Sequence, residues 1–405
     1  MERSYPTFTV TEKAEHSIRL GHPWVYDSEI LAGECENGRL ANVTSRKGRW
    51  LGAGFYNGNS KIRLRIISRN ANDDFSEAFF ERRLRHAVDY RRTVMGPDFA
   101  CCRLIFGEAD LFPGLTVDRF GSILVAQTLS LGIERIKPML FRLLVKILRE
   151  YGEPVEAIYE RNDVKIRELE GMEQGKGFFP GEGLAGDLPG VTEICENGIY
   201  YSVDYVNGQK TGFFLDQKYN RLAAARLAPG RRVLDCFTHT GAFALNAAKA
   251  GAAHVCAVDV SADAVAMAER NAARNQLAEN MSFRGANVFD LLTQMAESKN
   301  REFDYIILDP PAFTKSHGTV RNAERGYREI NRKAMQLLPR GGYLATCSCS
   351  HFMTEELFCK MLHRAAEDAG RSLRQIEARQ QSPDHPILWN VPETNYLKFY
   401  LFQVV

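Results

Sequence analysis

The stretch "RRVLDCFTHTGAFALNAAKAGAAHVCAVDVSADAVAMAERNAARN", residues 231–275, decides the expected fold. Its apolar run "RRVLDCF" predicts a buried strand, and "GAFALNAAKAG" predicts the helix that follows. The run "HVCAVDV" predicts a second strand, which leads into the helix "ADAVAMAERNAARN" with Ser261 as its N-cap. Buried strands that alternate with helices of this length are typical of a doubly wound, largely parallel sheet, so we expect an α/β fold.

The same alternation continues toward the C-terminus through "MSFRGANVF", "FDYIILDPP" and "YLATCSCS", and ends in the apolar run "NYLKFYLFQVV". Ligands on such a sheet bind outside the carboxyl ends of its strands. That rule places Asp235, Asp259, Asp309 and Cys349 along one edge of the predicted sheet. Two thiols, Cys347 and Cys349, therefore belong to the expected functional edge.

The preceding residues divide into two further segments. Residues 1–70 show short apolar–polar alternations between Gly, Asn and Ser turn signals, which predict an all-β segment, a small barrel. Residues 75–185 mix strands and helices: a helix over 77–96, a hairpin about Phe120-Gly121 and a helix over 135–152. We therefore expect three domains, at 1–70, 75–185 (α+β) and 190–405.

Composition narrows the class of protein. The 405 residues carry 52 Lys+Arg against 50 Asp+Glu, and residues 1–70 alone hold 11 Lys/Arg and 7 Asp/Glu, a local excess of positive charge. Such an excess suits RNA contact or a merely solvated face. No 18-residue apolar run and no signal-peptide core occur, so a soluble, cytoplasmic protein without membrane contact is expected.

The nine cysteines predict neither a disulfide framework nor a metal site. Their number is odd, and a reducing cytoplasm disfavours disulfides. Although "CSCSH" offers two thiols and a histidine, no second ligand pair occurs at metal spacing, so no metal is predicted. Cys347 and Cys349 can therefore be either buried core residues or candidates for a catalytic nucleophile.

The predicted cofactor follows from the ends of the first two strands. The turn "DCFTHTGAFAL" (235–245) lacks G-x-G-x-x-G and has Gly241 as its only glycine, which disfavours NAD or a nucleoside triphosphate. Asp259 ends the next strand, where an acid can hold both hydroxyls of a ribose. Either acid alone could simply cap a helix, but together they favour S-adenosylmethionine.

The set "DCFTHTGAF", "DPPAF" and "TCSCS" resembles the RlmI-type family of 23S ribosomal RNA cytosine-C5 methyltransferases. "GHPWVYDSEI" and "LGAGFYNGNSKIRLRIIS" are similar to the PUA RNA-binding domain that opens these proteins. "FGEADLFPGLTVDRFG" resembles their central domain, and "VNGQKTGFFLDQKYNR" the segment that leads into the catalytic domain. The resemblance covers nearly the whole chain, and implies a PUA domain, a central domain and a class I (Rossmann-like) methyltransferase domain.

The resemblance also implies roles for matching positions. Cofactor binding is implied for Asp235, Phe237, Thr238, His239, Thr240, Gly241, Asp259, Val260, Asn287, Val288 and Asp309, and for the capping segment Lys210, Thr211, Phe214, Asp216 and Gln217. Two positions depart from the family pattern: His239 stands where tyrosine is more usual, and Cys347 is an additional thiol.

The family's chemistry explains a thiol at the end of a strand. A thiolate that adds to cytosine C6 makes C5 nucleophilic enough to take a methyl group, and Asp309 would bond the ring at N3. The Ser-Cys-Ser pattern makes Cys349 the first choice for this nucleophile and Cys347 the second. The base that removes the C5 proton stays unassigned, with His351 and Glu355 nearby in sequence.

The expected activity is therefore formation of 5-methylcytosine in large-subunit ribosomal RNA, before the subunit is fully assembled, because the target base must be unstacked. The alternatives are methylation of another base or RNA, and a non-catalytic RNA-binding assembly factor. A homodimer is compatible with the sequence, although no feature demands one.

Overall fold

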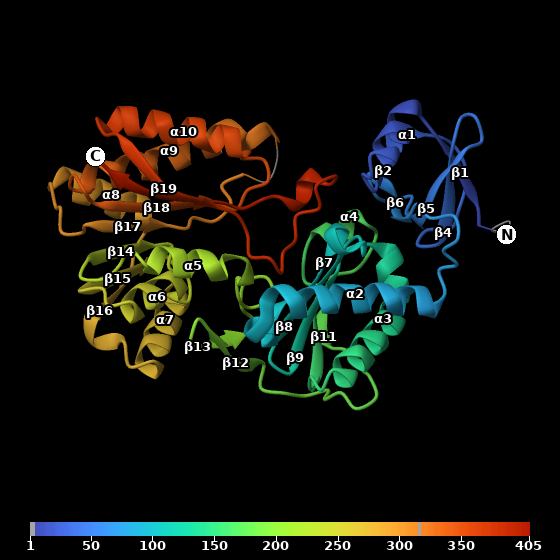
Figure 1. The fold of residues 1–405 in the computed structure, drawn as a ribbon, viewed down its shortest axis with the longest axis horizontal. Helices are drawn as coiled ribbons and strands as arrows, with labels where there is room; N and C mark the ends of the chain where they lie inside the picture. The colour runs from blue at the N-terminus through green and yellow to red at the C-terminus, as the bar shows by residue number, and fades with distance from the viewer. Residues whose placement is uncertain (1–4, 315–316) are drawn as a thin grey trace. The chain divides into compact units, whose positions relative to one another are not determined.

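The computed structural model describes residues 5–314 and 317–405, which form two compact units. Unit 1 contains residues 1–194, 203–215 and 383–394, and unit 2 contains residues 195–202, 216–382 and 395–405. The chain thus returns to unit 1 shortly before its end. Figure 1 shows the elements of each unit along the chain.

The first sheet of unit 1 is built from residues 7–68, which contain β1 (Thr7–Val10), β2 (Trp24–Tyr26), β3 (Ile30–Ala32), β4 (Leu40–Ser45), β5 (Trp50–Tyr56) and β6 (Ile62–Ser68). Its strand order is β2-β6-β5-β4-β1-β3. The all-β prediction is wrong at α1 (Glu12–Arg19), a helix that Thr11 caps by accepting from the Ala14 N–H, and that buries Ala14 and Ile18.

The second sheet of unit 1 has the order β11-β10-β9-β8-β7. Its elements are α2 (Glu77–Met95), β7 (Cys101–Phe106), β8 (Leu115–Phe120), β9 (Ile123–Thr128), α3 (Leu131–Glu150), β10 (Ala157–Arg161), α4 (Ile166–Leu169) and β11 (Lys176–Phe178). The predicted hairpin is confirmed as β8 and β9, which turn at Gly121 with φ +64°. Helix α2 begins after its N-cap Ser76 and ends at Gly96, as predicted.

A short hairpin of β12 (Val191–Glu196) and β13 (Ile199–Asp204) precedes the large sheet. Unit 2 then contains α5 (Lys218–Ala225), β14 (Arg232–Cys236), α6 (Ala242–Lys249), β15 (His254–Asp259), α7 (Ala262–Arg274), β16 (Met281–Gly285), α8 (Val288–Glu297), β17 (Tyr305–Leu308), α9 (Val320–Leu337), β18 (Tyr343–Ser348), α10 (Glu355–Ala369), β19 (Leu373–Arg379) and β20 (Lys398–Val404). The seven-stranded order is β16-β15-β14-β17-β18-β20-β19.

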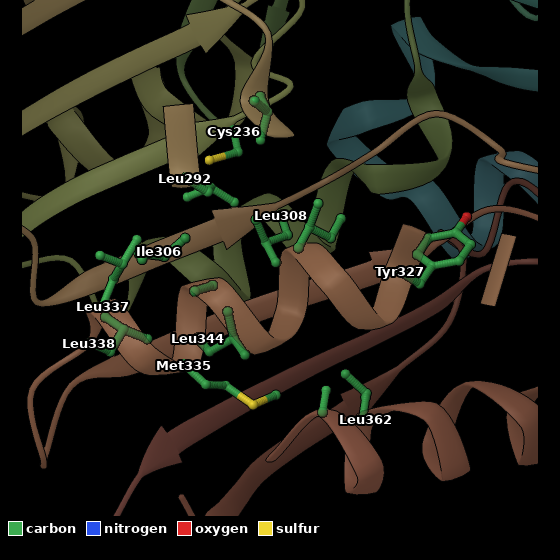
Figure 2. Close-up of a cluster of buried hydrophobic side chains, with 14 of the residues drawn as sticks. Cys236, Leu292, Ile306, Leu308, Tyr327, Met335, Leu337, Leu338, Leu344 and Leu362 are labelled. Atoms are coloured by element: carbon green, nitrogen blue, oxygen red, sulfur yellow. The ribbon is translucent and has the colours of Figure 1, made fainter. Parts of the chain in front are cut away.

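Helices cover both faces of this sheet, as the doubly wound prediction requires. In Figure 1, α8, α9 and α10 lie on one face, and α5, α6 and α7 lie on the other. Figure 2 shows the first of these layers, where Leu292, Tyr327, Met335 and Leu362 pack with Leu308 and their neighbours. Most members of this core are less than 5% exposed, so the layer is closely packed against the sheet.

The register of the sheet brings distant residues to one rim. Strands β16, β15, β14, β17 and β18 are parallel neighbours, so their carboxyl ends share one edge. Asp235 pairs with Ile307, and Leu308 with Thr346, which aligns the residues that follow each strand. Beyond β18, the strand direction reverses, because β20 pairs with β18 in an antiparallel manner.

Candidate active site

The first part of the rim is the turn between β14 and α6, residues 237–241. Phe237 and His239 have φ angles of +65° and +50°, a left-handed backbone conformation that residues other than glycine rarely adopt. Gly241, at φ +85°, lies so close to α7 that an added Cβ would be 2.9 Å from the Cβ of Ala268. Local strain of this kind is typical of ligand-binding turns.

Asp235 is fully buried beneath this turn and holds it. Its Oδ2 accepts hydrogen bonds from the Thr238 hydroxyl at 2.5 Å and from the Ala244 N–H at 3.0 Å. Its Oδ1 is also buried and has no hydrogen-bond partner in residues 5–314 and 317–405. Burial raises the pKa of Asp235 to about 7. A buried oxygen without a donor is suited to accept from a ligand such as the ammonium group of an amino acid.

Asp259, at the end of β15, is the second carboxylate of the rim. Its Oδ2 accepts from the His239 N–H at 2.9 Å, and its Oδ1 accepts from the Ser261 N–H at 3.0 Å. Each oxygen retains a lone pair, so the carboxylate can also accept from the two hydroxyls of a ribose. Val260, beside it, is 76% exposed and offers an uncovered apolar surface.

His239 does not add a pH-sensitive charge to this turn. Burial lowers the pKa of its imidazole to about 4, although the nearby Asp259 carboxylate opposes that shift. The ring is therefore neutral at neutral pH, and it can take part in the turn only as a dipole or an apolar ring.

The third strand end supplies the start of α8. Asn287 is exposed and caps the helix, because its Oδ1 accepts from the Phe289 N–H at 2.9 Å. Val288 is buried in the core. The Ala286 N–H donates to the Asp259 backbone oxygen at 2.9 Å, which ties this strand end to the previous one.

Asp309, Gln217 and Cys347 form a compact cluster where β17 ends. The Cys347 thiol donates to Asp309 Oδ1 at 2.9 Å, and Gln217 Nε2 donates to the same oxygen at 3.1 Å. Both of these hydrogen bonds end on Oδ1. Burial raises the pKa of the Asp309 carboxyl group.

The two thiols have different environments. Cys347 lies within β18, is 1% exposed, and has a pKa well above the ordinary range because of burial and the neighbouring Asp309 carboxylate. Cys349 follows the last residue of β18 and is half-buried. The two thiols, which strand alternation places on one face, therefore differ in exposure.

Two side chains next to the Cys349 segment were not identified from the sequence. Tyr327 of α9 shares a hydrogen bond of 3.0 Å with the Ser348 hydroxyl, and Lys398 of β20 donates to the Ser350 backbone oxygen at 2.6 Å. Lys398 was detectable in principle, since a lysine within the apolar run "NYLKFYLFQVV" is unusual for a buried strand.

The segment predicted to cap the cofactor is divided between the two units. In unit 1, the Thr211 hydroxyl donates to the buried carboxylate of Asp118 at 2.6 Å, and the Lys210 ammonium lies 5.0 Å from the ring centre of Phe214. In unit 2, Asp216 Oδ2 accepts from the Tyr396 hydroxyl at 2.6 Å. Gln217, also in unit 2, is thus the segment's one member in the Asp309 cluster.

The described part of the chain offers neither a clustered metal site nor a membrane span. No group of three or more His, Cys, Asp or Glu side chains gathers at metal-binding distance anywhere in residues 5–314 and 317–405. Within the same residues, no helix has the length and apolar character that crossing a membrane requires.

Comparisons with known proteins bear on the family and the fold of the chain. A family model of S-adenosylmethionine-dependent methyltransferases matches residues 177–403, and a PUA-like domain model matches residues 8–69. Ribosomal RNA large subunit methyltransferase I of Klebsiella pneumoniae is 38% identical over 405 residues, 99% of both chains. The protein of the same name from Salmonella arizonae is 39% identical over 406 residues, 99% of this chain and 98% of its own.

The fold is also similar to that of solved structures. A Streptococcus mutans structure assigned as a SAM-dependent methyltransferase has a TM-score of 0.81 at 22% identity, and covers 98% of this chain and 99% of its own. A methyltransferase structure in complex with SAH has a TM-score of 0.82 at the same identity and coverage. The predicted fold and the predicted cofactor, S-adenosylmethionine, are confirmed.

Proposed function

Because the chain belongs to the ribosomal RNA large subunit methyltransferase I family, we propose that it methylates carbon 5 of a cytosine in 23S ribosomal RNA, with Cys349 as nucleophile. The observation that carries this proposal is the arrangement at the ends of two neighbouring parallel strands. A half-buried thiol, Cys349, follows β18, and Asp309, whose pKa is raised, follows β17 and is bonded by Cys347 of the same β18 segment. S-adenosylmethionine, when bound, supplies an electrophilic methyl group on a sulfonium.

The thiolate of Cys349 forms a bond to C6 of the cytosine, and the electron pair of the C5–C6 double bond moves toward N3. Asp309 supports this step, because the raised pKa favours its protonated form, which can donate a hydrogen bond at N3. The hydrogen bonds from Gln217 and Cys347 both end on Oδ1, so Oδ2 is the oxygen suited to carry that proton. C5 then accepts the methyl group.

Completion of the reaction needs a base. The C5 proton is removed, the C5–C6 double bond reforms, and the Cys349 thiolate leaves C6. Glu355 and His351 follow Cys349 closely in sequence, but Glu355 Oε1 already accepts from the Tyr400 hydroxyl at 2.7 Å. We leave this base unassigned.

Cys349 is favoured over Cys347 as the nucleophile on physical grounds. The Cys347 thiol is buried and its pKa is raised well above the ordinary range, so little thiolate forms there. Its short bond to Asp309 instead suits a residue that orients the carboxyl group. Cys349 is only half-buried, and the proposed reaction needs a thiol that a flipped base can reach.

The cofactor would be held by the groups already described. Asp235 Oδ1 suits the ammonium group, and Asp259 suits the ribose hydroxyls. Asn287 and Val288 would flank the adenine. For Lys210, Thr211 and Phe214 the capping role rests on the family resemblance, with Asp216 and Gln217 completing that segment.

RNA contact is supported by charge in the PUA-like domain. The turn between β4 and β5 exposes Arg46, Lys47 and Arg49, none of which makes an ion pair with a residue in the described part of the chain. Cations of this kind bind phosphates and release counterions, so RNA affinity should fall as salt rises. Unassembled large-subunit RNA is the proposed substrate.

The test uses two readouts of one set of variants: wild type, Cys349→Ala and Cys347→Ala. The first is methyl transfer from labelled S-adenosylmethionine to protein-free 23S RNA, with the product nucleoside identified by mass. The second is trapping on RNA that contains 5-fluorocytosine, where the fluorine cannot leave as a cation and the protein–RNA bond persists in denaturant.

We expect 5-methylcytosine, and a trapped adduct, from wild type and Cys347→Ala but not from Cys349→Ala. If Cys347→Ala is inactive and Cys349→Ala is active, the nucleophile is Cys347 and not Cys349. A different methylated nucleoside would overturn the cytosine assignment. A protein that fails to bind S-adenosylmethionine would instead support a non-catalytic RNA-binding assembly factor.

A further inference from the structure

Lys398 is a buried cation that the reaction described so far does not use. It begins β20, where it stands opposite Ser348 of β18, and it is 6% exposed in a strand whose other residues, apart from Gln403, are apolar or aromatic. Burying an ammonium group is costly unless partners stabilise it. Its position opposite the residue that precedes the candidate nucleophile therefore calls for a physical reason.

Hydrogen bonds satisfy the ammonium group only in part. Lys398 Nζ donates to the Ser350 backbone oxygen at 2.6 Å and to the Tyr396 backbone oxygen at 2.7 Å. An ammonium group has three N–H donors. The third has no acceptor among residues 5–314 and 317–405, and both acceptors already bound are neutral carbonyl groups.

The first of these bonds holds the backbone immediately after Cys349. Ser350 is further fixed by its own hydroxyl, which donates to the Thr314 backbone oxygen at 3.0 Å. The ammonium group is thereby fixed beside the backbone that directly follows Cys349.

The groups that face this pair come from several elements. Cys349 and Cys347 of the β18 segment and Glu355 of α10 would each stabilise the Lys398 charge, whereas burial lowers its pKa to about 8. Tyr327 of α9 faces both thiols, but its pKa is raised by burial, so it stays neutral. Asp309, after β17, faces Cys347 and opposes ionisation of that thiol.

We propose that Lys398 is a positioning residue whose buried ammonium group, bonded to the residue after Cys349, stabilises Cys349 as a thiolate through its charge. The inference rests on the proposed role of Cys349. The proposed reaction needs the Cys349 thiol to ionise, and Lys398 supplies a cause. An unassisted thiol has a pKa of about 8.5 and is mostly protonated at neutral pH.

The pairing has a consequence for pH. The Cys349 thiolate forms at a lower pH than the thiolate of an isolated cysteine, and its stabilisation is lost when Lys398 releases its proton. Because each charge supports the other, the two groups titrate as a pair.

The experiment measures how fast iodoacetamide alkylates Cys349 between pH 5.5 and 9.5, in the full-length protein without RNA. Peptide mass spectrometry resolves Cys349 from the other thiols. The variants are Lys398→Gln, which keeps N–H donors for the two carbonyl groups without the charge, and Lys398→Arg, which keeps the charge. Lys360→Gln, an exposed lysine of α10, is the matched control.

We expect the wild-type rate to rise with an inflection below pH 8.5. In Lys398→Gln the inflection should move up by about one unit, so that alkylation at pH 7 slows roughly tenfold. Lys398→Arg should restore most of the rate, and Lys360→Gln should match wild type.

An unchanged inflection in Lys398→Gln would overturn the inference and reduce Lys398 to an anchor of the loop. If Lys398→Gln does not fold, a wild-type inflection at or above pH 8.5 overturns it equally. The alkylation readout is independent of methyl transfer. If Cys349 is not the nucleophile, the Cys349→Ala variant will still transfer methyl groups. If only the Lys398 inference fails, Cys349→Ala will still be inactive and only the alkylation result will differ from expectation.

Discussion

Asp235→Asn is the substitution for which the structure gives the most complete expectation. The carboxyl group is fully buried, and burial raises its pKa from 3.8 to about 7. In the unfolded chain the same group ionises near its ordinary value. The folded protein therefore binds the Asp235 proton more tightly than the unfolded chain does. The contribution of this proton to the free energy of unfolding is present at low pH and is lost as pH rises through about 7.

The size of the effect follows from that difference. A shift of this size corresponds to about 4 kcal/mol between the fully protonated and fully ionised limits, at 1.36 kcal/mol per pKa unit. From pH 8 to pH 5.5 the wild-type protein should gain about 2 kcal/mol from this group alone. Asparagine cannot ionise, so the variant should lack this part of the pH dependence.

Asparagine can also keep the local hydrogen bonds. Its carbonyl oxygen can accept from the Thr238 hydroxyl and the Ala244 N–H, as Oδ2 does now. Its NH₂ group would stand where Oδ1 lacks a donor. We thus expect Asp235→Asn to be more stable than wild type at pH 8 without cofactor, and to bind S-adenosylmethionine much more weakly, because an acceptor becomes a donor.

The assay is denaturant unfolding of the ligand-free protein at pH 8 and pH 5.5. The unfolding transition that is measured is the one whose midpoint S-adenosylhomocysteine raises in a separate experiment. Titration calorimetry gives the affinity. Asp304→Asn, which changes a carboxylate at the other end of the sheet, is the control. The reasoning is refuted if Asp235→Asn is less stable at pH 8, or if its stability advantage over wild type is as large at pH 5.5 as at pH 8.

Four further predictions concern three single residues and one turn. Asp259→Ala should weaken S-adenosylhomocysteine binding at least tenfold by calorimetry, since hydrogen bonds to a charged group contribute about 1.5–3 kcal/mol each; unchanged affinity would exclude the ribose role. His239→Tyr should leave the pH dependence of that binding unaltered between pH 6 and 8, because the imidazole is already neutral; a lost inflection would contradict this. Glu196→Gln should lower stability by about 3–5 kcal/mol, because it leaves the Arg221 charge buried without the carboxylate that now lies 2.6 Å away; a thermal midpoint equal to wild type would refute it. Replacement of Arg46, Lys47 and Arg49 by Ala should flatten the salt dependence of RNA binding, by a log–log slope of about 0.7 for each phosphate that the variant no longer neutralises; an identical slope would remove this turn from the RNA surface.

The sequence misread two elements because their apolar signal is weak. Helix α1 is short and buries only Ala14 and Ile18, so the sequence over Glu12–Arg19 has few apolar positions from which to predict a helix within the all-β segment. Strand β19 was not predicted at all. Its side chains are mainly exposed or half-buried, and an edge strand without a buried face has no alternation to detect.

The sequence by itself determined the order of strands and helices in residues 231–405, apart from β19, and the presence of Asp235, Asp259, Asp309 and Cys349 at strand ends. Local periodicity is enough for that, because a strand that is buried on both faces must be apolar along its length and polar where it ends. The tertiary structure alone decided what each of these groups can do. Burial raises the pKa of Asp235, Asp309 and Cys347, whereas Cys349 is only half-buried. The ammonium group of Lys398 reaches Ser350 across 48 residues of chain. Ionisation depends on which atoms surround a group in three dimensions, and no local pattern of residues contains that information.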